Sequence, residues 1–267
     1  MTEWRLLNYE NLIPYDATVL EDVLRHEVGS GRSPSTVFTF TTELCVTYSG
    51  KIDMGLINVE ECERRGVPIV RHIIGRGGPL FGDPSMFTPF VFHSLNDKTH
   101  YSSKKQATDL FTEVLKGTFA EFGLILTRSE HRPDANDLVV NTNKAATVLA
   151  TSSKGCMIYF ATILPDFNYD LAEKLLNVYP SKFVNKPHKT MREWVTTLKK
   201  ELGRDVSLEE LRRVLIKQIE EKFDVTLIEG ELTGEEKELS VGLREKHESE
   251  EWTKGGRWSP VKDYGLR

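Results

Sequence analysis

Short strand-like runs alternate with amphipathic helices along most of this chain, and their order limits the folds that the chain can adopt. Runs rich in Val, Thr and Phe predict strands, and apolar residues three or four apart predict helices. The strands are expected at residues 4–7, 36–42, 44–48, 67–70, 87–92, 124–127, 137–140, 145–150 and 157–164, and the helices at 18–28, 59–65, 106–122, 170–178 and 207–223. This mixed order predicts an α+β fold with mixed, largely antiparallel sheets flanked by helices.

Composition narrows the class of protein. The chain has 267 residues, of which 39% are apolar and 28% charged, and it carries a net charge of −5. A negative charge argues against a general nucleic-acid binder. No apolar run reaches the roughly 18 residues that a membrane span needs, and the first residues do not read as a signal peptide. We therefore expect a globular cytoplasmic protein with neither nucleic-acid nor membrane partners.

The three cysteines, Cys45, Cys62 and Cys156, are odd in number and widely spaced. The sequence contains no CxxC motif and no histidine at zinc-finger spacing, so a disulfide framework or a structural zinc is not expected. We expect reduced cysteines that act as small apolar residues. A catalytic thiol stays open as an alternative.

The last third of the chain changes character. A helix at 207–223 is predicted from its apolar face and from the S-x-x-E capping pattern of Ser207 and Glu210. Beyond Gly230 the chain is charged and poor in apolar residues, with Trp252, Trp258 and Tyr264 as exceptions. We expect this tail to be a peripheral strap that is held, if at all, by its aromatic residues.

A basic, glycine-rich turn follows the predicted strand at 67–70. Its glycines permit close backbone approach to a ligand, and consecutive N–H groups in such a turn can bind an anion. Arg71 and Arg76 add guanidinium groups suited to phosphate or carboxylate. The turn therefore suggests a phosphate- or adenylate-binding loop, with an ordinary basic surface turn as the alternative. It is neither a P-loop nor a dinucleotide fingerprint.

A second candidate site combines Asn136 and Asp137, at the start of a predicted strand, with Lys144 after the next turn. A lysine at a sheet edge can neutralise charge that develops on a phosphate. The alternative is a solvated lysine in a hairpin, because residues 141–143 have the composition of a turn.

Taken together and in this order, the two sites resemble the lipoate–protein ligase family, which shares its catalytic fold with biotin–protein ligases and octanoyltransferases. The resemblance extends over most of the chain. Residues 71–83 correspond to the family's signature of two arginines followed by three glycines, and Asn136–Asp137 with Lys144 correspond to its Asn-Asp motif and essential lysine. The other matching segments are residues 4–7, 17–28, 36–40, 45–48, 60–62, 66–71, 189–190 and 195–198.

The resemblance implies a two-step reaction. ATP and lipoate, or a related acid, would give an acyl-adenylate, which a lysine of an acceptor domain would attack. Lys144 would be the catalytic residue, and Asn136 and Asp137 would orient it, with Asp137 also a weak candidate ligand for Mg²⁺. The implied adenylate- or ATP-binding residues are Arg71, His72, Gly75, Arg76, Gly77, Gly78, Pro79, Leu80, Phe81 and Lys144. Leu80 and Phe81 would also help to form an apolar slot for the acyl chain.

The chain departs from the family pattern at several positions. His72 replaces the second arginine, and Arg76 interrupts the glycine triplet, where we hypothesise that it supplies the missing guanidinium. Thr147 and Ala161 stand where the family has glycine, so they are expected to narrow the ligand pocket. These departures keep open a non-catalytic relative that binds a ligand or a lipoyl-carrying partner.

An acyl-carrier-dependent octanoyl- or lipoyltransferase is the other alternative. It needs a cysteine nucleophile before the Asn-Asp segment, and no cysteine lies between Cys62 and Cys156.

For the domains, the resemblance implies one catalytic domain at 1–230, closed by the helix at 207–223, a charged extension at 231–267, and no accessory domain. The implied partners are a lipoyl acceptor, such as a 2-oxoacid dehydrogenase E2 component or the glycine cleavage H protein, and a separate small accessory protein.

Overall fold

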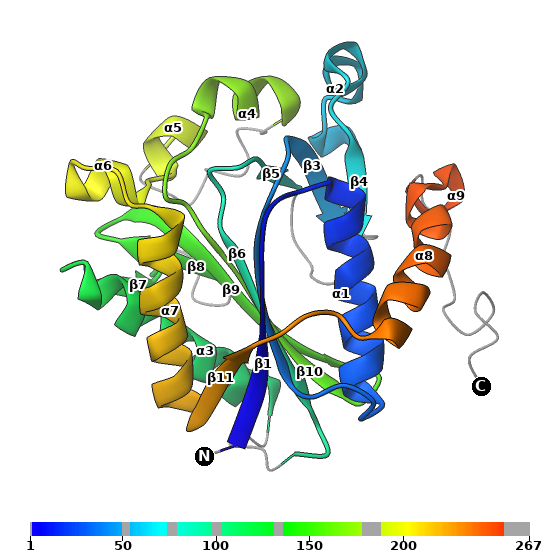
Figure 1. Ribbon diagram of the computed structural model, residues 1–267. Helices are drawn as coiled ribbons and strands as arrows, with labels where there is room; N and C mark the ends of the chain where they lie inside the picture. Colours follow the sequence, from blue (N-terminus) through cyan, green and yellow to red (C-terminus); the bar gives the residue numbers. More distant parts are fainter. Residues whose placement is uncertain are drawn as a thin grey trace.

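A computed structural model describes residues 2–49, 54–73, 79–97, 103–130, 136–177 and 188–253 (Figure 1). Within these ranges an eight-stranded sheet forms the centre of the molecule. Its strands lie in the order β11 (Val225–Glu229), β1 (Thr2–Leu12), β2 (Thr36–Thr42), β6 (Thr88–Ser94), β10 (Cys156–Ile163), β9 (Asn143–Ser153), β8 (Asp137–Val140) and β7 (Leu126–Arg128). A three-stranded sheet has the order β4 (Ile69–His72), β3 (Cys45–Ser49) and β5 (Leu80–Gly82).

Most neighbouring strands are antiparallel; the parallel pairs among the described residues are β1 with β11, β1 with β2, and β3 with β4. Helices cover both faces of the large sheet. The helices are α1 (Pro14–Gly29), α2 (Val59–Arg65), α3 (Lys104–Glu121), α4 (Tyr169–Leu175), α5 (Met191–Trp194), α6 (Leu198–Leu202), α7 (Leu208–Phe223), α8 (Gly234–Glu248), α9 (Glu250–Thr253) and the 3₁₀ turn η1 (Met54–Leu56). The predicted α+β class with mixed, largely antiparallel sheets is therefore confirmed.

Two apolar cores lie on opposite faces of the large sheet (Figure 1). On one face, α3 and α7 contribute residues such as Phe111 and Leu215 to a core around Val91 of β6. On the other face, α1 packs Leu20 and Leu24 onto the aromatic residues of β2, β6 and β10. A third cluster joins the small sheet to α2, α4 and α5.

Helix α1 is buried on its outer side as well, because α8 lies along it (Figure 1). Val19 and Val23 of α1 pack on Leu243 of α8. Lys246 of α8 contacts Asp22 of α1 at 2.9 Å. Burial on two sides therefore encloses polar residues of α1 that an ordinary surface helix would expose to water.

The predicted element boundaries agree closely with the structure where the local signal was strong. Strand β2 and helix α2 have the predicted limits, and α2 ends at Gly66 with a positive φ of 65°, the left-handed conformation that glycine adopts without steric cost. Strand β4 is displaced from the predicted 67–70 and runs to His72.

The peripheral character expected for the residues beyond Gly230 is wrong for the part that the structure describes. Helix α8 packs along α1, and Trp252 of α9 is buried. Glu236, Lys246 and His247 of α8 are buried although they are polar. The hydrophobic pattern missed this docking because charged contacts carry much of it.

None of the helices in the described part of the chain is long and apolar enough to cross a membrane.

Candidate active site

Lys144 and Asp137 form an ion pair across the β8–β9 hairpin. Lys144 Nζ lies 2.8 Å from Asp137 Oδ1, and the two side chains are 22% and 18% exposed. The turn at Asn141, whose φ is 55°, brings the strands together. The backbone N–H of Thr196 donates to the Lys144 carbonyl at 2.8 Å, which ties the hairpin to the segment before α6. The result is a half-buried ammonium held by one carboxylate.

The register of the large sheet places Asp137 of this ion pair in one row with residues on four neighbouring strands. Phe40 pairs with Thr88, Thr147 pairs with Thr162, and Asp137 pairs with Thr147. Thr88 stands opposite Thr162, because Phe87 bridges Ile163 and Phe90 pairs with Phe160. Directly paired side chains point to the same face, so we call Phe40, Thr88, Thr162, Thr147 and Asp137 the cross-strand row.

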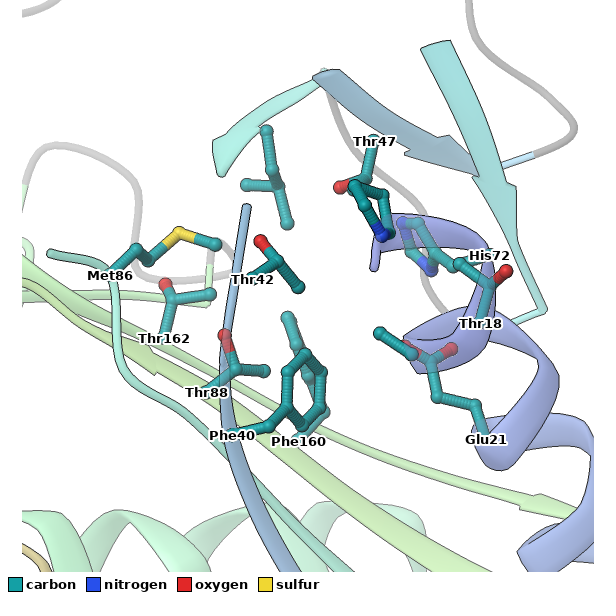
Figure 2. A pocket seen from close by; sticks show the side chains of 13 residues that line it. Thr18, Glu21, Phe40, Thr42, Thr47, His72, Met86, Thr88, Phe160 and Thr162 are labelled. Carbon is teal, nitrogen blue, oxygen red and sulfur yellow. The ribbon is translucent and has the colours of Figure 1, made fainter. Parts of the chain in front are cut away.

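A pocket lies above this row, between α1, the large sheet and the small sheet (Figure 2). It contains about 410 Å³ of space between atoms, including the part that opens to solvent. We call it the α1 pocket, and it is lined by Pro14, Ala17, Thr18, Glu21, Phe40, Thr42, Thr47, His72, Leu80, Met86, Thr88, Phe160 and Thr162. Two strand spacings of about 5 Å place the Asp137 backbone about 10 Å from that of Thr162.

The lining of the α1 pocket is mainly apolar, with a few hydroxyl groups. Phe40 and Phe160 project into it from the large sheet, and the side chains of Thr88 and Thr162 lie beside them (Figure 2). An apolar cavity with few polar groups is typical of a small-molecule site. This chemistry suits an aliphatic chain.

His72, at the end of β4, lines the α1 pocket, whereas Arg71 contacts α9. Successive side chains of a strand point to opposite faces, which explains the difference. Burial, aided by the charge of Arg71, lowers the pKa of His72 to about 4, so its ring is neutral near pH 7.

Arg71 is held by Trp252 of α9. Its guanidinium lies 4.4 Å from the centre of the indole ring and donates to the Trp252 carbonyl at 3.1 Å. The indole N–H donates to the Arg71 carbonyl at 3.1 Å. Lys246 Nζ lies 4.1 Å from the same ring. The C-terminal segment therefore fixes the strand that leads into the glycine-rich turn.

Glu21 is a pocket residue that the sequence analysis missed. It is 5% exposed, and burial, reinforced by the neighbouring Asp22, raises its pKa well above the usual range. Its Oε2 atom has no hydrogen-bond partner among the described residues. The available signal was helical spacing, since Ala17, Glu21 and Leu24 share one face of α1 and Glu21 is its only charged member.

The remaining predicted site residues are distributed between the pocket and its surroundings. Gly75, Arg76, Gly77 and Gly78 lie outside the described residues. Leu80, the first residue of β5, lines the α1 pocket, and Pro79 directly precedes this strand. Phe81 instead belongs to the core of the small sheet and contacts Phe167. The Asn136 carbonyl accepts from the N–H of Val148 at 2.8 Å, which fixes the start of β8.

The expectation that Ala161 narrows the pocket is wrong. Ala161 faces the α3–α7 core on the opposite side of the sheet. Its neighbours Phe160 and Thr162 face the pocket, because side chains alternate along β10. Thr147 lies next to Thr162 in the cross-strand row, outside the residues that line the pocket. On this strand, Phe160 and Thr162 line the pocket and Ala161 does not.

The three cysteines are free and fully buried, which confirms the expectation of small apolar residues. Burial raises the pKa of Cys45 and of Cys156 to about 12, and that of Cys62 to about 11. None of them lines the α1 pocket. In the described ranges, no group of three or more His, Cys, Asp or Glu side chains could hold a metal ion.

Comparisons with known proteins agree with this fold. The model of the lipoyl protein ligase A/B catalytic domain matches residues 13–220. Octanoyltransferase LipM of Clostridioides difficile is 20% identical over 95% of this chain and 99% of its own length.

Two solved structures resemble the chain over nearly their full lengths. The bipartite lipoate–protein ligase of Thermoplasma acidophilum, solved in a study with its E2 lipoyl domain, has a TM-score of 0.79 at 21% identity, and covers 98% of this chain and 100% of its own. A lipoate–protein ligase A bound with ATP has a TM-score of 0.77 at 19% identity and covers 95% and 99%. These likenesses confirm the predicted ligase-like fold.

Proposed function

The chain belongs to the lipoyl protein ligase A/B catalytic domain family, and from this premise we propose that it is an ATP-dependent lipoate–protein ligase. It would activate lipoate, or a related acid, as the acyl-adenylate and transfer the acyl group to a lysine of an acceptor protein. The observation that carries the proposal is the ion pair of Lys144 and Asp137, placed in line with an apolar pocket.

In the first step, a carboxylate oxygen of the acid attacks the α-phosphorus of ATP, and the bond from that phosphorus to the bridging oxygen of pyrophosphate breaks. The acyl chain occupies the α1 pocket, and its carboxylate lies toward Lys144. The ammonium of Lys144 reduces repulsion between the carboxylate and the phosphate and stabilises the added charge on phosphorus. Asp137 holds Lys144 in position. Alignment of the two anions supplies much of the rate.

In the second step, the neutral amine of the acceptor lysine attacks the acyl carbonyl, and AMP leaves with the bonding electron pair. The proton that the new amide nitrogen releases passes to the departing phosphate or to solvent. This route requires no covalent intermediate with the enzyme, which agrees with three cysteines that are buried away from the pocket.

The proposed adenylate contacts come from Arg71 and the glycine-rich turn that follows β4. Trp252 holds Arg71 and thereby fixes the position of β4. The neutral ring of His72 faces the α1 pocket, so it would contact the acyl chain instead of the nucleotide. For Mg²⁺, Asp137 offers one carboxylate, which fits an ion that arrives on nucleotide phosphates and keeps most of its water ligands. Such an ion would neutralise phosphate charge.

The test is pyrophosphate release from ATP and Mg²⁺ with lipoate as the acid. We expect release by the wild type and a loss of about 10²–10³-fold in Lys144→Ala, as when an enzyme loses one group that stabilises developing charge. Lys105→Ala is the matched control, because Lys105 is an exposed lysine on α3. Full activity in Lys144→Ala would contradict the proposal. Silence with lipoate, octanoate and biotin would favour a non-catalytic binding protein.

A second candidate is an acyl-carrier-dependent octanoyltransferase, which the full-length similarity to LipM favours. Acyl transfer from an octanoylated carrier protein in the absence of ATP would support it. Loss of that transfer in Cys45→Ala, Cys62→Ala or Cys156→Ala would identify a thiol nucleophile. The burial of all three sulfurs supports the ligase over this candidate.

For partners, we propose an E2-type lipoyl domain or an H-protein as acceptor, and a small accessory protein that assists the first step. The bipartite organisation of the Thermoplasma ligase and the lipoyl domain studied with it support this proposal. Adding each candidate protein to the pyrophosphate assay tests whether it accepts the acyl group or stimulates activation.

A further inference from the structure

One wall of the α1 pocket is polar in a way that the ion pair at Lys144 does not explain. Glu21 lies on this wall and is 5% exposed. The backbone N–H of Ile73 hydrogen-bonds to its carboxyl group, while Oε2 has no hydrogen-bond partner among the described residues. Buried polar atoms are almost always paired with protein, water or ligand. An unpaired carboxyl oxygen beside a cavity therefore points to a group that enters the cavity.

The position of Glu21 fixes which part of an acid it would meet. In Figure 2, Glu21 lies with Thr18 and His72 on one side of the pocket, and Met86 and Thr162 lie on the other. Thr162 lies beside Thr147 of β9, the strand that carries Lys144, on the side of the pocket away from Glu21. A carboxylate held near Lys144 therefore directs the far end of its chain toward Glu21.

The charge state of this wall limits the class of ligand. Burial and the adjacent Asp22 favour the protonated form of Glu21, because they raise its pKa well above the usual range. The oxygen that does not accept from Ile73 can then carry the proton and act as a donor. His72 is neutral because burial lowers its pKa to about 4. Because Glu21 and His72 are both neutral, they do not favour a ligand with a cationic end. The O–H group of Glu21 instead suits a neutral acceptor atom on the ligand.

Resting on the adenylation proposed above, we propose that Glu21 determines specificity by donating a hydrogen bond to the far end of the acid chain. The substrate class is then a medium-chain acid with a neutral heteroatom acceptor at its distal end, such as the ring sulfurs of lipoate, in preference to an unsubstituted chain such as octanoate. Glu21 is a recognition residue, and it takes no part in the chemistry at the carboxylate.

Calorimetric titration of lipoate and octanoate into the ATP-free protein tests this assignment. We expect the wild type to bind lipoate more tightly than octanoate. In Glu21→Leu, the ratio of the two affinities should fall about two- to fivefold, the lower range for one hydrogen bond, because sulfur is a weak acceptor. Glu21→Gln should keep the ratio, because its amide still donates to the ligand and still accepts from Ile73. Glu113→Gln, an exposed change on α3, is the matched control.

Two results would overturn the inference: equal affinities of the wild type for both acids, or an unchanged ratio in Glu21→Leu with a native circular dichroism spectrum. Pyrophosphate release, measured on the same proteins, separates this inference from the ligase reaction. A ratio that depends on Glu21 without pyrophosphate release would support the recognition role and contradict the reaction. Pyrophosphate release together with an affinity ratio that does not depend on Glu21 would support the ligase reaction and contradict the recognition role.

Discussion

Two consecutive acidic residues of α1 have opposite electrostatic environments. Asp22 is buried, which by itself would raise its pKa, but His247, Arg25 and Lys246 surround it and lower the pKa well below the usual range. Glu21, one residue earlier, faces the pocket, where burial raises its pKa. At the residue scale, position on the helix thus decides between a structural carboxylate and a neutral carboxyl group.

The raised pKa of Glu21 predicts a pH dependence of stability. Above pH of about 4.5 the unfolded chain releases this proton while the folded protein retains it, so the free energy of unfolding falls as the pH rises. The slope from one such group is at most about 1.4 kcal/mol per pH unit. Glu21→Gln removes the group, so its stability relative to the wild type should increase between pH 4.5 and pH 7.

Urea unfolding of both proteins at several pH values measures this difference, with Glu113→Gln as the control for an exposed carboxyl group. A constant difference in stability across the range would show that Glu21 ionises alike in the folded and unfolded states.

The sequence located the residues of the ion pair and His72, but it did not locate Glu21 on the opposite pocket wall. Lys144 and Asp137 lie seven residues apart in one hairpin, so local spacing was enough to bring them together. Glu21 and His72 meet only because α1 packs against the end of β4. Sequence spacing carries no information about such a contact between distant elements.

At the scale of elements, α8 shows how charged contacts can dock a helix that has few apolar residues. Glu236 is fully buried. It accepts two hydrogen bonds from Arg5 of β1, at 2.6 and 2.7 Å, and one from Ser33 at 2.7 Å. It also accepts from the N–H of Thr233 at 2.8 Å, which completes a capping box. One side chain thus starts the helix and anchors it to the sheet.

Replacing Glu236 by Ala should destabilise the protein by about 3–5 kcal/mol, because it leaves the guanidinium of Arg5 buried without its carboxylate. Urea unfolding measures the loss, and hydrogen exchange should show reduced protection in α8. Glu238→Ala is the control, since Glu238 is exposed on the same helix. Equal stabilities of the two variants would contradict the anchoring role.

Elements with a strong local pattern were predictable, and elements that depend on distant partners were not. Strand β2 follows from alternating Thr, Val and Phe, and α7 begins at Ser207, whose hydroxyl accepts from the N–H of Glu210. The Glu210 carboxylate, however, binds Arg204. Strand β11 has only five residues and forms at the sheet edge beside β1, so a partner from the start of the chain decides its structure.

On the scale of the whole molecule, the two ends of the described chain are interlocked. Strand β11 pairs with β1, α8 packs along α1, and α9 contacts β4 through Trp252. The residues after Gly230 therefore cover the helix that forms one wall of the α1 pocket. The proposed boundary of the catalytic domain at residue 230 is directly testable for this reason.

A chain that ends at residue 230 should unfold at a lower temperature than the full chain and should bind acids more weakly. It lacks the partners of Arg5, Asp22 and Arg71, and its α1 loses the apolar cover of Leu243. Scanning calorimetry of both chains, with lipoate titration, checks this. An unchanged melting temperature with unchanged lipoate binding would instead show that residues 1–230 are an independent unit.

The pairing of β1 with β11 also has a consequence for synthesis of the protein. Thr2 is paired with Val225, so Thr2 cannot find its partner until another 223 residues have been translated. At about 5–20 residues per second, roughly 10–40 seconds pass before this partner has been made. During that interval β1 has an open edge and α1 has no cover from α8. The nascent chain therefore exposes this strand edge and the outer side of α1 until β11 and α8 have been translated.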